Sequence, residues 1–491
     1  MNEGILSFLV ILAYLFILMG VALYCYKSEK IKNVESFFLA NRGVSSVLLP
    51  LTMIAAMQST FAFLGAPGMY YTHGIGFIVI VLSQAWVALM VIHFGHRIWQ
   101  LGKKYGYLTI GDFFKDRYDS NFLKVFASAV SILMTVVFLA MQYVGSARAI
   151  SGVSGEQISY LFALVVIAVF SLIYVITGGA KSVVLTDAIQ AIILLSGIVI
   201  AAYIAIVPVG GISALFSKIA ETAPELLSRP GPKGLYNDKN WVMQFILLPF
   251  GIWLCPHVWV RSLMAKDEKA ISTSAMAVPI SQIVIFATSG LFIGLSGHLL
   301  LQNLEVPDNV VPVLMNQYTN WFVASLVMAA SIAAGMSTIN SMILVCSQMF
   351  TQDIIIPFMR RKLREEENLL ISRIVTLVIV VLGTLIAYKP PALLVSVVID
   401  VAYTGLAQMA PAFILGLYWK RCNRTGATFG MVAGIVILFL TRIYRINPLG
   451  YPGFLWAFLV NLVLTVGLSL MTEKPSIEKV EKIIGYFEGA R

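Results

Sequence analysis

A short polar stretch inside an apolar segment is the part of the sequence best suited to binding an ion. Residues 331–341 read Ser-Ile-Ala-Ala-Gly-Met-Ser-Thr-Ile-Asn-Ser. Ala334, Ser337 and Thr338 are spaced so that on a helix they share one face, with two hydroxyls beside a backbone carbonyl. Neutral oxygens suit a hard monovalent cation that must also be released. Close helix packing is the other interpretation, because small residues are common where membrane helices meet.

The composition identifies the kind of protein that must position this stretch. Of the 491 residues, 59% are hydrophobic and only 12% are charged. Apolar runs of roughly 20 residues, each long enough to cross a bilayer, recur from one end of the chain to the other. We therefore expect an all-α polytopic membrane protein with about 13 transmembrane helices. The expected spans are 4–26, 45–70, 75–100, 122–147, 157–178, 185–208, 241–262, 272–300, 321–350, 370–388, 393–418, 426–444 and 453–471.

The basic residues that give a net charge of +10 lie mostly in the connections between these spans, so we attribute them to topology and not to nucleic-acid binding. They gather after the odd-numbered spans, whereas residues 301–320 contain no Lys or Arg. The positive-inside rule then puts the N-terminus outside and the C-terminus inside the cell membrane. The basic residues used are Lys27, Lys30, Lys32, Arg42, Lys103, Lys104, Lys115, Arg117, Lys181, Arg261, Lys266, Lys269, Arg360, Arg361, Lys362, Arg364, Lys420, Arg421 and Arg424.

Two of the expected spans are interrupted. The second carries Gly65, Pro67 and Gly68 after a weakly apolar centre at 57–60, and the seventh carries Pro249, Gly251 and Pro256. Counted from the second span, the seventh begins a new set of five, and matched broken helices indicate an inverted-repeat transporter with its site at the breaks. The expected organisation is an extra transmembrane helix and cytoplasmic loop at 1–44, a first five-helix repeat at 45–210, an extracellular loop at 211–240, a second repeat at 241–418, and two further transmembrane helices with a short cytoplasmic tail at 419–491.

Polar groups inside apolar spans are candidates for function. Asp187 is either a helix cap or an ion ligand. Gln84 and Gln142 either bond between helices or line the pocket of a polar substrate. His257 follows the second break and is either structural or a proton carrier. No Walker motif, nucleophile elbow or metal-ligand cluster is apparent, so we expect neither an ATP-driven pump nor an enzyme, and no organic cofactor.

Several motifs resemble those of the sodium:solute symporter family over nearly the whole chain, and most closely its sodium/pantothenate branch. They are residues 63–71, Phe-Leu-Gly-Ala-Pro-Gly-Met-Tyr-Tyr; 177–190, Thr-Gly-Gly-Ala-Lys-Ser-Val-Val-Leu-Thr-Asp-Ala-Ile-Gln; 256–261, Pro-His-Val-Trp-Val-Arg; 336–340, Met-Ser-Thr-Ile-Asn; 389–391, Lys-Pro-Pro; and 416–421, Gly-Leu-Tyr-Trp-Lys-Arg. The resemblance implies the LeuT-type five-plus-five inverted repeat.

The same resemblance implies a sodium site. The backbone carbonyls of Ala55 and Gln58 would face the Ala334 carbonyl and the Ser337 and Thr338 hydroxyls. Na⁺ would therefore be the coupling ion.

Some relatives have a second sodium site, built from two hydroxyls and an aspartate that corresponds to Asp187. The two hydroxyl positions here are Asn340 and Ser341, which match only in part. We therefore favour one sodium ion, with Asp187 assisting ion release or gating.

The substrate expectation depends on a departure from the relatives. Proline-transporting relatives carry an aspartate where this chain has Met57. Without that anion an ammonium group loses its partner, so a carboxylate or a neutral polyol-amide fits better. The expected substrate-binding residues are Ser59, Phe61, Gln84, Gln142 and Trp253.

The sequence thus predicts a sodium-coupled symporter that imports a small organic anion, such as pantothenate, across the lipid bilayer by alternating access. Transport of a short monocarboxylate or of proline is the alternative for the substrate, and proton coupling through Asp187 or His257 is the alternative for the ion. A channel and a transporter-like sensor are the rivals from other classes. The oligomeric state stays open.

Overall fold

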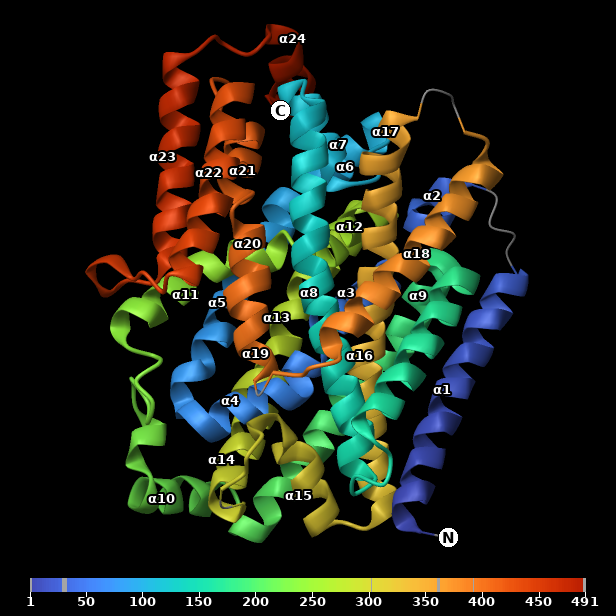
Figure 1. The fold of residues 1–491 in the computed structure, drawn as a ribbon, viewed down its shortest axis with the longest axis vertical. Helices are drawn as coiled ribbons and strands as arrows, with labels where there is room; N and C mark the ends of the chain where they lie inside the picture. Colours follow the sequence, from blue (N-terminus) through green and yellow to red (C-terminus); the bar gives the residue numbers. More distant parts are fainter. Residues whose placement is uncertain (1, 29–32, 302, 360–362, 392, 489–491) are drawn as a thin grey trace.

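The computed structural model describes residues 2–28, 33–301, 303–359, 363–391 and 393–488, and helices make up most of it (Figure 1). Lys30, Lys32, Arg360, Arg361 and Lys362, which entered the prediction of orientation, lie outside the described residues. The principal helices are α1 (Glu3–Ser28), α3 (Leu48–Met57), α4 (Ala66–His73), α5 (Val79–Met90), α6 (His96–Tyr105), α8 (Asn121–Val153), α9 (Tyr160–Ile206), α11 (Asp238–Trp253), α12 (Pro256–Met264), α13 (Glu268–Gln282), α14 (Leu291–Leu300), α16 (Trp321–Met349), α18 (Glu365–Ala387), α21 (Ala410–Tyr418), α22 (Arg424–Ile443) and α23 (Gly453–Met471). Shorter helices in the connections and at the ends are α2 (Val34–Leu39), α7 (Ile110–Tyr118), α10 (Ile212–Thr222), α15 (Val310–Tyr318), α17 (Ile356–Phe358), α19 (Leu394–Val397), α20 (Thr404–Ala407), α24 (Ile477–Val480) and α25 (Tyr486–Glu488).

The membrane-spanning helices agree with the predicted all-helical membrane fold. Within the described residues, ten helices are long and apolar enough to cross a membrane, or eleven if the bent pair α11 and α12 forms one span. The sequence suggested about 13 because two continuous helical stretches, 61–105 and 160–209, each take in parts of two expected spans. At about 1.5 Å per residue, the second stretch is too long for one crossing. It bends at Gly179, whose φ of 58° and ψ of −166° suit a residue without a side chain.

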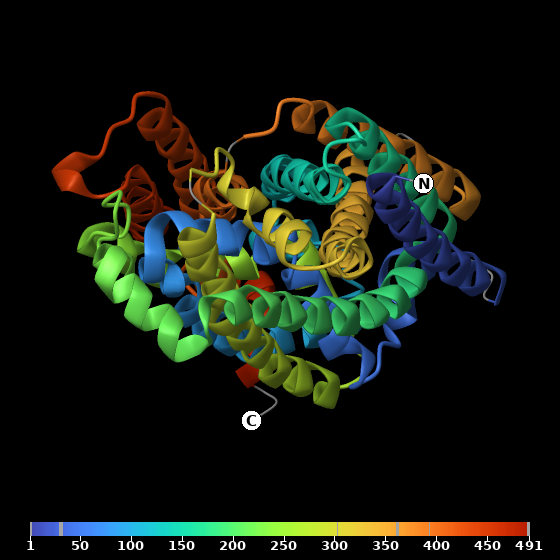
Figure 2. The same ribbon diagram turned by 90° about the horizontal axis from the view of Figure 1, so that it is seen from below.

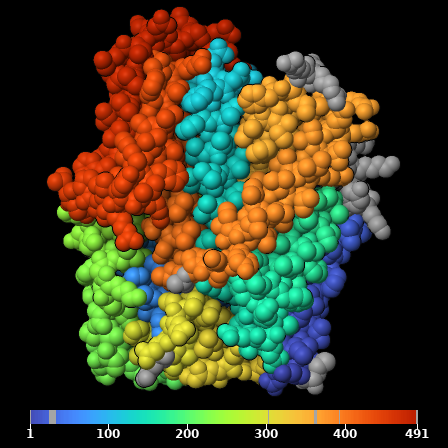
Figure 3. Space-filling model, viewed as in Figure 1, coloured from blue at the N-terminus to red at the C-terminus, as the bar shows by residue number. Residues whose placement is uncertain are grey.

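Helix α16 is at the centre of the bundle and packs against α8 and α9 (Figures 1 and 2). Helix α1 lies along α9 at one side, and α22 pairs with α23 at the other. The outer faces are apolar, with Phe16, Leu385 and Val463 more than 60% exposed. Such residues face lipid in a membrane protein. Figure 3 shows one face of the molecule, on which the C-terminal residues (red) lie at the upper left.

The first predicted break occurs within the second expected span, at its weakly apolar centre rather than at the Gly-Pro-Gly group. Helix α3 ends at Met57, Gln58 is extended (φ −95°, ψ 113°), and a π-helix, η2, resumes at Phe61–Gly65. The Gln142 Oε1 accepts hydrogen bonds from the Thr60 amide at 3.0 Å and from its hydroxyl at 2.9 Å. A side chain of α8 therefore accepts a hydrogen bond from a backbone amide at the start of the resumed helix, where amides have no partner within the helix.

The second break separates α11 from α12. Cys255 is not helical (φ −56°, ψ 120°), Pro256 opens α12, and the two helices are bent by 52°. Pro is favoured at a first helical position because its missing N–H would be unbonded there in any case. A Cβ at Gly251 would lie 2.0 Å from the Tyr403 carbonyl in the π-helix η10 (Val398–Tyr403). The glycine therefore allows the broken helix to approach η10 closely.

The described N- and C-terminal ends lie at opposite ends of the molecule (Figure 1). This is the arrangement that an odd number of crossings produces. Which end faces the cytoplasm, and the boundaries of the two five-helix repeats, stay predictions.

Candidate functional site

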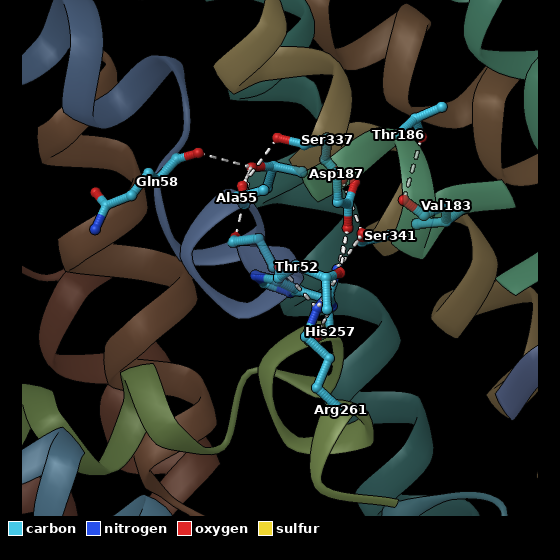
Figure 4. Close-up of polar contacts among 12 residues, drawn as sticks. Thr52, Ala55, Gln58, Val183, Thr186, Asp187, His257, Arg261, Ser337 and Ser341 are labelled. Atoms are coloured by element: carbon cyan, nitrogen blue, oxygen red, sulfur yellow. Dashed lines mark hydrogen bonds and ion pairs between the residues drawn. The ribbon is translucent and has the colours of Figure 1, made fainter. Parts of the chain in front are cut away.

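A cluster of buried oxygens joins the first break to α16. The Ser337 Oγ lies 2.9 Å from the Ala55 carbonyl and 3.0 Å from the Ala334 carbonyl. The Thr338 Oγ1 lies 3.1 Å from the Ala334 carbonyl and 3.4 Å from the carbonyls of both Ala55 and Gln58. All five residues are fully buried. The structure thus brings together all five groups that were expected to form the sodium site. Figure 4 shows Ala55, Gln58 and Ser337 of this cluster.

The chemistry of this cluster suits a monovalent cation. Three carbonyls and two hydroxyls supply only neutral oxygens, and no carboxylate takes part. The carbonyls of Ala55 and Gln58 are available because the helix stops there and leaves them without their usual amide partners. Within the described residues, no group of three or more His, Cys, Asp or Glu side chains could hold a metal ion. The residues present therefore fit Na⁺ better than a divalent ion.

A second buried network lies one turn along α16 and is centred on Arg261 (Figure 4). The Arg261 Nη2 donates to the Asp187 Oδ2 at 2.8 Å and to the Ser341 Oγ at 2.7 Å. Its Nε donates to the Thr52 carbonyl at 3.0 Å, and its Nη1 donates to the His257 carbonyl. The Thr52 Oγ1 donates to the same Asp187 oxygen at 2.6 Å. A guanidinium therefore holds the carboxylate and the hydroxyl that were expected to form a second sodium site or a release route.

The position of Arg261 in this network was not predicted from the sequence, where the residue served as a charge that sets orientation and as the last residue of the motif 256–261. The side chain is 2% exposed and belongs to the half-helix that follows the second break. A buried charge within an expected span was the signal that could have identified it. Of the other second-site candidates, Asn340 is buried and its Oδ1 has no hydrogen-bond partner among the described residues.

A small pocket of about 20 Å³ lies between the two breaks. Its apolar walls include Phe61, Phe138 and Tyr403, whose rings pack edge to face. Its polar groups come from Gln84, Gln282 and His257. The Oε1 atoms of both glutamines and the His257 Nδ1 are buried without a hydrogen-bond partner in the described part of the chain. A ligand with hydroxyl or amide N–H groups would satisfy them.

Only two of the five predicted substrate residues, Phe61 and Gln84, line this pocket. Gln142 instead bonds to Thr60, and the Ser59 Oγ accepts a hydrogen bond from the Phe61 amide at 3.2 Å. Trp253 is 1% exposed and lies outside the pocket lining.

Gln282 and Tyr403 are among the pocket residues that were not predicted from the sequence. His257 was considered from the sequence as a structural group or a proton carrier. Gln282 could have been found as a polar residue in the apolar span 272–300.

Phe77 packs against the pocket residues Phe61 and Phe286, at 6.4 Å between ring centroids in each case, and a buried ion pair lies outside the pocket lining. Phe77 packs against Tyr70 at 5.2 Å and against Tyr236 at 6.4 Å between ring centroids. Asp308, in the 3₁₀ turn η8 (Pro307–Asn309), lies 3.1 Å from the Arg148 Nη1 and accepts a hydrogen bond from the Leu394 amide at 2.8 Å. Burial raises the pKa of Asp308 from its ordinary value of 3.8 to about 6, although the Leu394 N–H and Arg148 favour the charged form.

An oxygen cluster at the first break of a membrane-spanning bundle, with a pocket lined from both broken helices, is the arrangement of a transporter with the LeuT-type fold. A solved Na⁺-coupled sialic acid symporter, in a substrate-bound outward-open state, has the same fold: its TM-score is 0.79 at 20% identity, over 96% of this chain and 98% of that one. A nucleobase-cation-symport-1 family transporter in a closed conformation is similar with a TM-score of 0.60 at 11% identity, over 91% of this chain and 97% of that one.

The family follows from the sequence comparison. Residues 37–434 match the family model described as the sodium:solute symporter family. The chain belongs to this family, so it is a multi-pass, sodium-coupled symporter and not an enzyme. It is 30% identical to the sodium/pantothenate symporter of Haemophilus influenzae, over 89% of this chain and 90% of that protein. The sodium/pantothenate symporter of Escherichia coli is 28% identical over 92% and 94%, and the sodium/proline symporter 2 of Staphylococcus saprophyticus is 27% identical over 97% and 96%.

Proposed function

We propose that the protein imports a small organic anion such as pantothenate together with Na⁺, which binds to the oxygens of Ala55, Gln58, Ala334, Ser337 and Thr338. The observation that carries the proposal is the convergence of these neutral oxygens at a helix break. A cation that loses its water needs such a set of partners, and neutral ligands also let it leave. The same proposal includes the orientation of the protein, with the N-terminus outside and the C-terminus inside the cell. It also includes the two five-helix repeats at 45–210 and 241–418.

The pocket supports an anionic substrate with hydroxyl or amide groups. Among the residues that the structure describes, no Asp, Glu, Lys or Arg side chain lines it, and Met57 occupies the wall where an anion would bind an ammonium group. Cys255, His257 and Val258, at the start of α12, do line it. The positive end of this half-helix would favour a carboxylate. Gln84 and Gln282 would then accept hydrogen bonds from the hydroxyl and amide N–H groups, which pantothenate has and a short monocarboxylate lacks.

Uptake into proteoliposomes tests the proposal directly. Radiolabelled pantothenate should accumulate only with an inward Na⁺ gradient, and excess unlabelled proline or acetate should not compete. A proton gradient in sodium-free buffer should not replace Na⁺. Sodium-driven uptake of proline in preference to pantothenate would overturn the substrate assignment, and equal uptake on a proton gradient would overturn the ion assignment.

We also propose that one Na⁺ moves in each cycle. The groups expected at a second site, Asp187 and Ser341, both bond to Arg261. A guanidinium already neutralises the carboxylate, so a second cation there would meet a like charge. The opening of this network is the step in which Asp187 would assist sodium release.

A further inference from the structure

A polar cavity of about 360 Å³ lies apart from the pocket between the two breaks, at the end of the molecule that carries the C-terminus. It forms where the end of α7, the start of α22 and the segment that follows α23 come together (Figure 1). The charged side chains that line it are Arg117, Arg424, Lys474, Lys479, Asp119 and Glu473. Four of these are basic and two are acidic, so the cavity carries an excess of positive charge.

The ion pair in the cavity wall does not neutralise this excess of positive charge. Lys479 lies 3.5 Å from Asp119, and these two charges offset each other. Arg424 and Lys474 are exposed. Together with Arg117 they outnumber the remaining carboxylate of Glu473. An anion in the cavity would therefore meet a net attraction.

The hydrogen bonding of Arg117 is stronger evidence for a ligand than the net charge of the cavity. Its side chain is 1% exposed, and two of its nitrogens donate to carbonyls: Nε to Gly416 at 2.7 Å and Nη2 to Trp419 at 3.1 Å. Its Nη1 is buried without a hydrogen-bond partner in the described part of the chain. A buried donor with no acceptor costs free energy, and an anionic oxygen would remove that cost.

Helix α22 adds a second source of positive potential. Its 20 residues begin at this cavity, with Asn423 as the N-cap, and Arg424 and Thr425 line the wall. The N-terminal end of a helix carries a partial positive charge that favours anions, and phosphate groups in particular.

We propose that this cavity binds a phosphate group, supplied by the headgroup of an anionic phospholipid. The membrane-facing end of α23 leads directly into it: Leu470 is 58% exposed and Met471 is 82% exposed, and Glu473 and Lys474 follow within the cavity wall. Acyl chains would lie against the apolar residues while the headgroup enters the basic cavity. Basic pockets beside the ends of transmembrane helices recognise anionic headgroups in this way.

Such a lipid would hold the C-terminal segment in its docked position. The segment crosses the same end of the molecule, where Lys482 lies 2.6 Å from Asp116 and its carbonyl accepts a hydrogen bond from the Tyr105 hydroxyl at 3.0 Å. Arg97 of α6 lies over the ring of Phe487 at 4.4 Å. Because these contacts reach α6 and α7, occupancy of the cavity would stabilise the contact between those helices and the tail.

The test is a lipid titration of the purified, detergent-solubilised full chain. Dioleoylphosphatidylglycerol should raise the melting temperature of the wild type, whereas zwitterionic dioleoylphosphatidylcholine should not. In the double variant Arg424→Gln/Lys474→Gln, the concentration for half of the effect should rise roughly 30-fold, since each basic residue near an anionic surface contributes about 1 kcal/mol. The matched control is Lys266→Gln/Lys269→Gln, which removes two exposed basic residues outside the cavity.

A parallel titration with inorganic phosphate distinguishes the source of the anion. Protection by millimolar phosphate that is lost in the Arg424→Gln/Lys474→Gln variant would keep the phosphate site but assign it to a soluble anion. Equal protection of all three proteins by phosphatidylglycerol, or protection by neither probe, would overturn the proposal.

Discussion

At the scale of single residues, the hydroxyls of α16 carry the most direct prediction. Ser337→Ala and Thr338→Ala each remove one oxygen from the five-membered cluster without changing the helix. The Na⁺ concentration for half-maximal uptake should rise roughly tenfold in each variant, because a desolvated cation loses one partner. Sodium-dependent uptake in proteoliposomes measures it.

The control for this prediction is Ser331→Ala. Ser331 is on the same helix and fully buried, and its hydroxyl has no partner among the described residues and lies outside the cluster. It should leave sodium activation unchanged. A similar shift in all three variants would indicate a general effect of packing along α16 instead of lost coordination.

Gln84 and Gln142, of which the first lines the pocket and the second bonds to Thr60, give a second prediction. Gln84→Ala removes an unpartnered carbonyl from the pocket, so the KM for substrate should rise about tenfold while sodium activation stays near that of the wild type. Gln142→Ala removes the acceptor for Thr60 at the first break, so it should lower the yield of folded protein. Kinetics and size-exclusion profiles of the two variants separate these effects; an unchanged KM in Gln84→Ala would reassign that side chain to helix packing.

What the sequence could predict at this scale depended on distance along the chain. Ala334, Ser337 and Thr338 share a face because of helix geometry, so their common direction was predictable. The partner of Gln142 was not, because Thr60 is 82 positions away and only tertiary packing decides which polar group reaches it. Arg261 escaped for the same reason, since Asp187 is 74 residues away.

At the scale of elements, the breaks were predictable but their positions were less so. Pro256 does open α12, as its chemistry requires. In the first broken helix, however, the interruption comes at Gln58, before Gly65 and Gly68. These two glycines allow other residues to pack closely against the helix. A Cβ added to Gly65 would lie 2.5 Å from the Val395 side chain, and a Cβ added to Gly68 would lie 2.8 Å from the Asp308 side chain. A Gly in a membrane helix can permit close packing as well as a break, and sequence alone does not separate the two.

The turn η8 gives a prediction about pH through its buried residue Asp308. Asp308 has a folded pKa of about 6 against an ordinary value of 3.8, so between these values the folded state binds more protons than the unfolded state. Its contribution to stability is therefore greatest at low pH and is lost as the pH rises through about 6. The melting temperature of the wild type minus that of Asp308→Asn should increase as the pH falls from 7 to 5.

Asp238→Asn is the control for this titration, because Asp238 is exposed and pairs with Arg229 at 3.2 Å on the surface. Its difference from the wild type should change little over the same range. A difference for Asp308→Asn that is flat, or that shrinks on acidification, would contradict the assignment of the raised pKa.

At the scale of the whole molecule, two neighbouring networks along α16 join the two broken helices to α9 and α16. The Ser341 Oγ donates to the Ser337 carbonyl at 2.8 Å, so the Arg261 network lies directly beside the cluster of buried oxygens. Thr52 and Arg261 belong to the two broken helices, whereas Asp187 and Ser341 belong to α9 and α16. Under the proposed alternating access, we expect the first pair to separate from the second when sodium is released towards the C-terminal end.

The number of sodium ions follows from the same network and gives the last prediction. One Na⁺ carried with a monoanion moves no net charge, so an inside-negative potential should not accelerate pantothenate uptake. A second Na⁺ would add about 2.3 kcal/mol of driving force per 100 mV. Because Arg261 already binds the Asp187 carboxylate and the Ser341 hydroxyl, we expect the electroneutral result. Uptake measured at a series of imposed potassium diffusion potentials, at a fixed Na⁺ gradient, decides it.

The variant Asp187→Asn tests whether the response of uptake to membrane potential depends on the Arg261 network. If only one Na⁺ moves, the variant should stay insensitive to potential, although its rate falls because Arg261 is left buried without its counter-charge. Wild-type uptake that accelerates with inside-negative potential, and that loses this response in Asp187→Asn, would mean that a second Na⁺ displaces the guanidinium during the cycle. Arg261 would then be a competitor for the site, and the bonds that it makes here would describe the protein before the second ion binds.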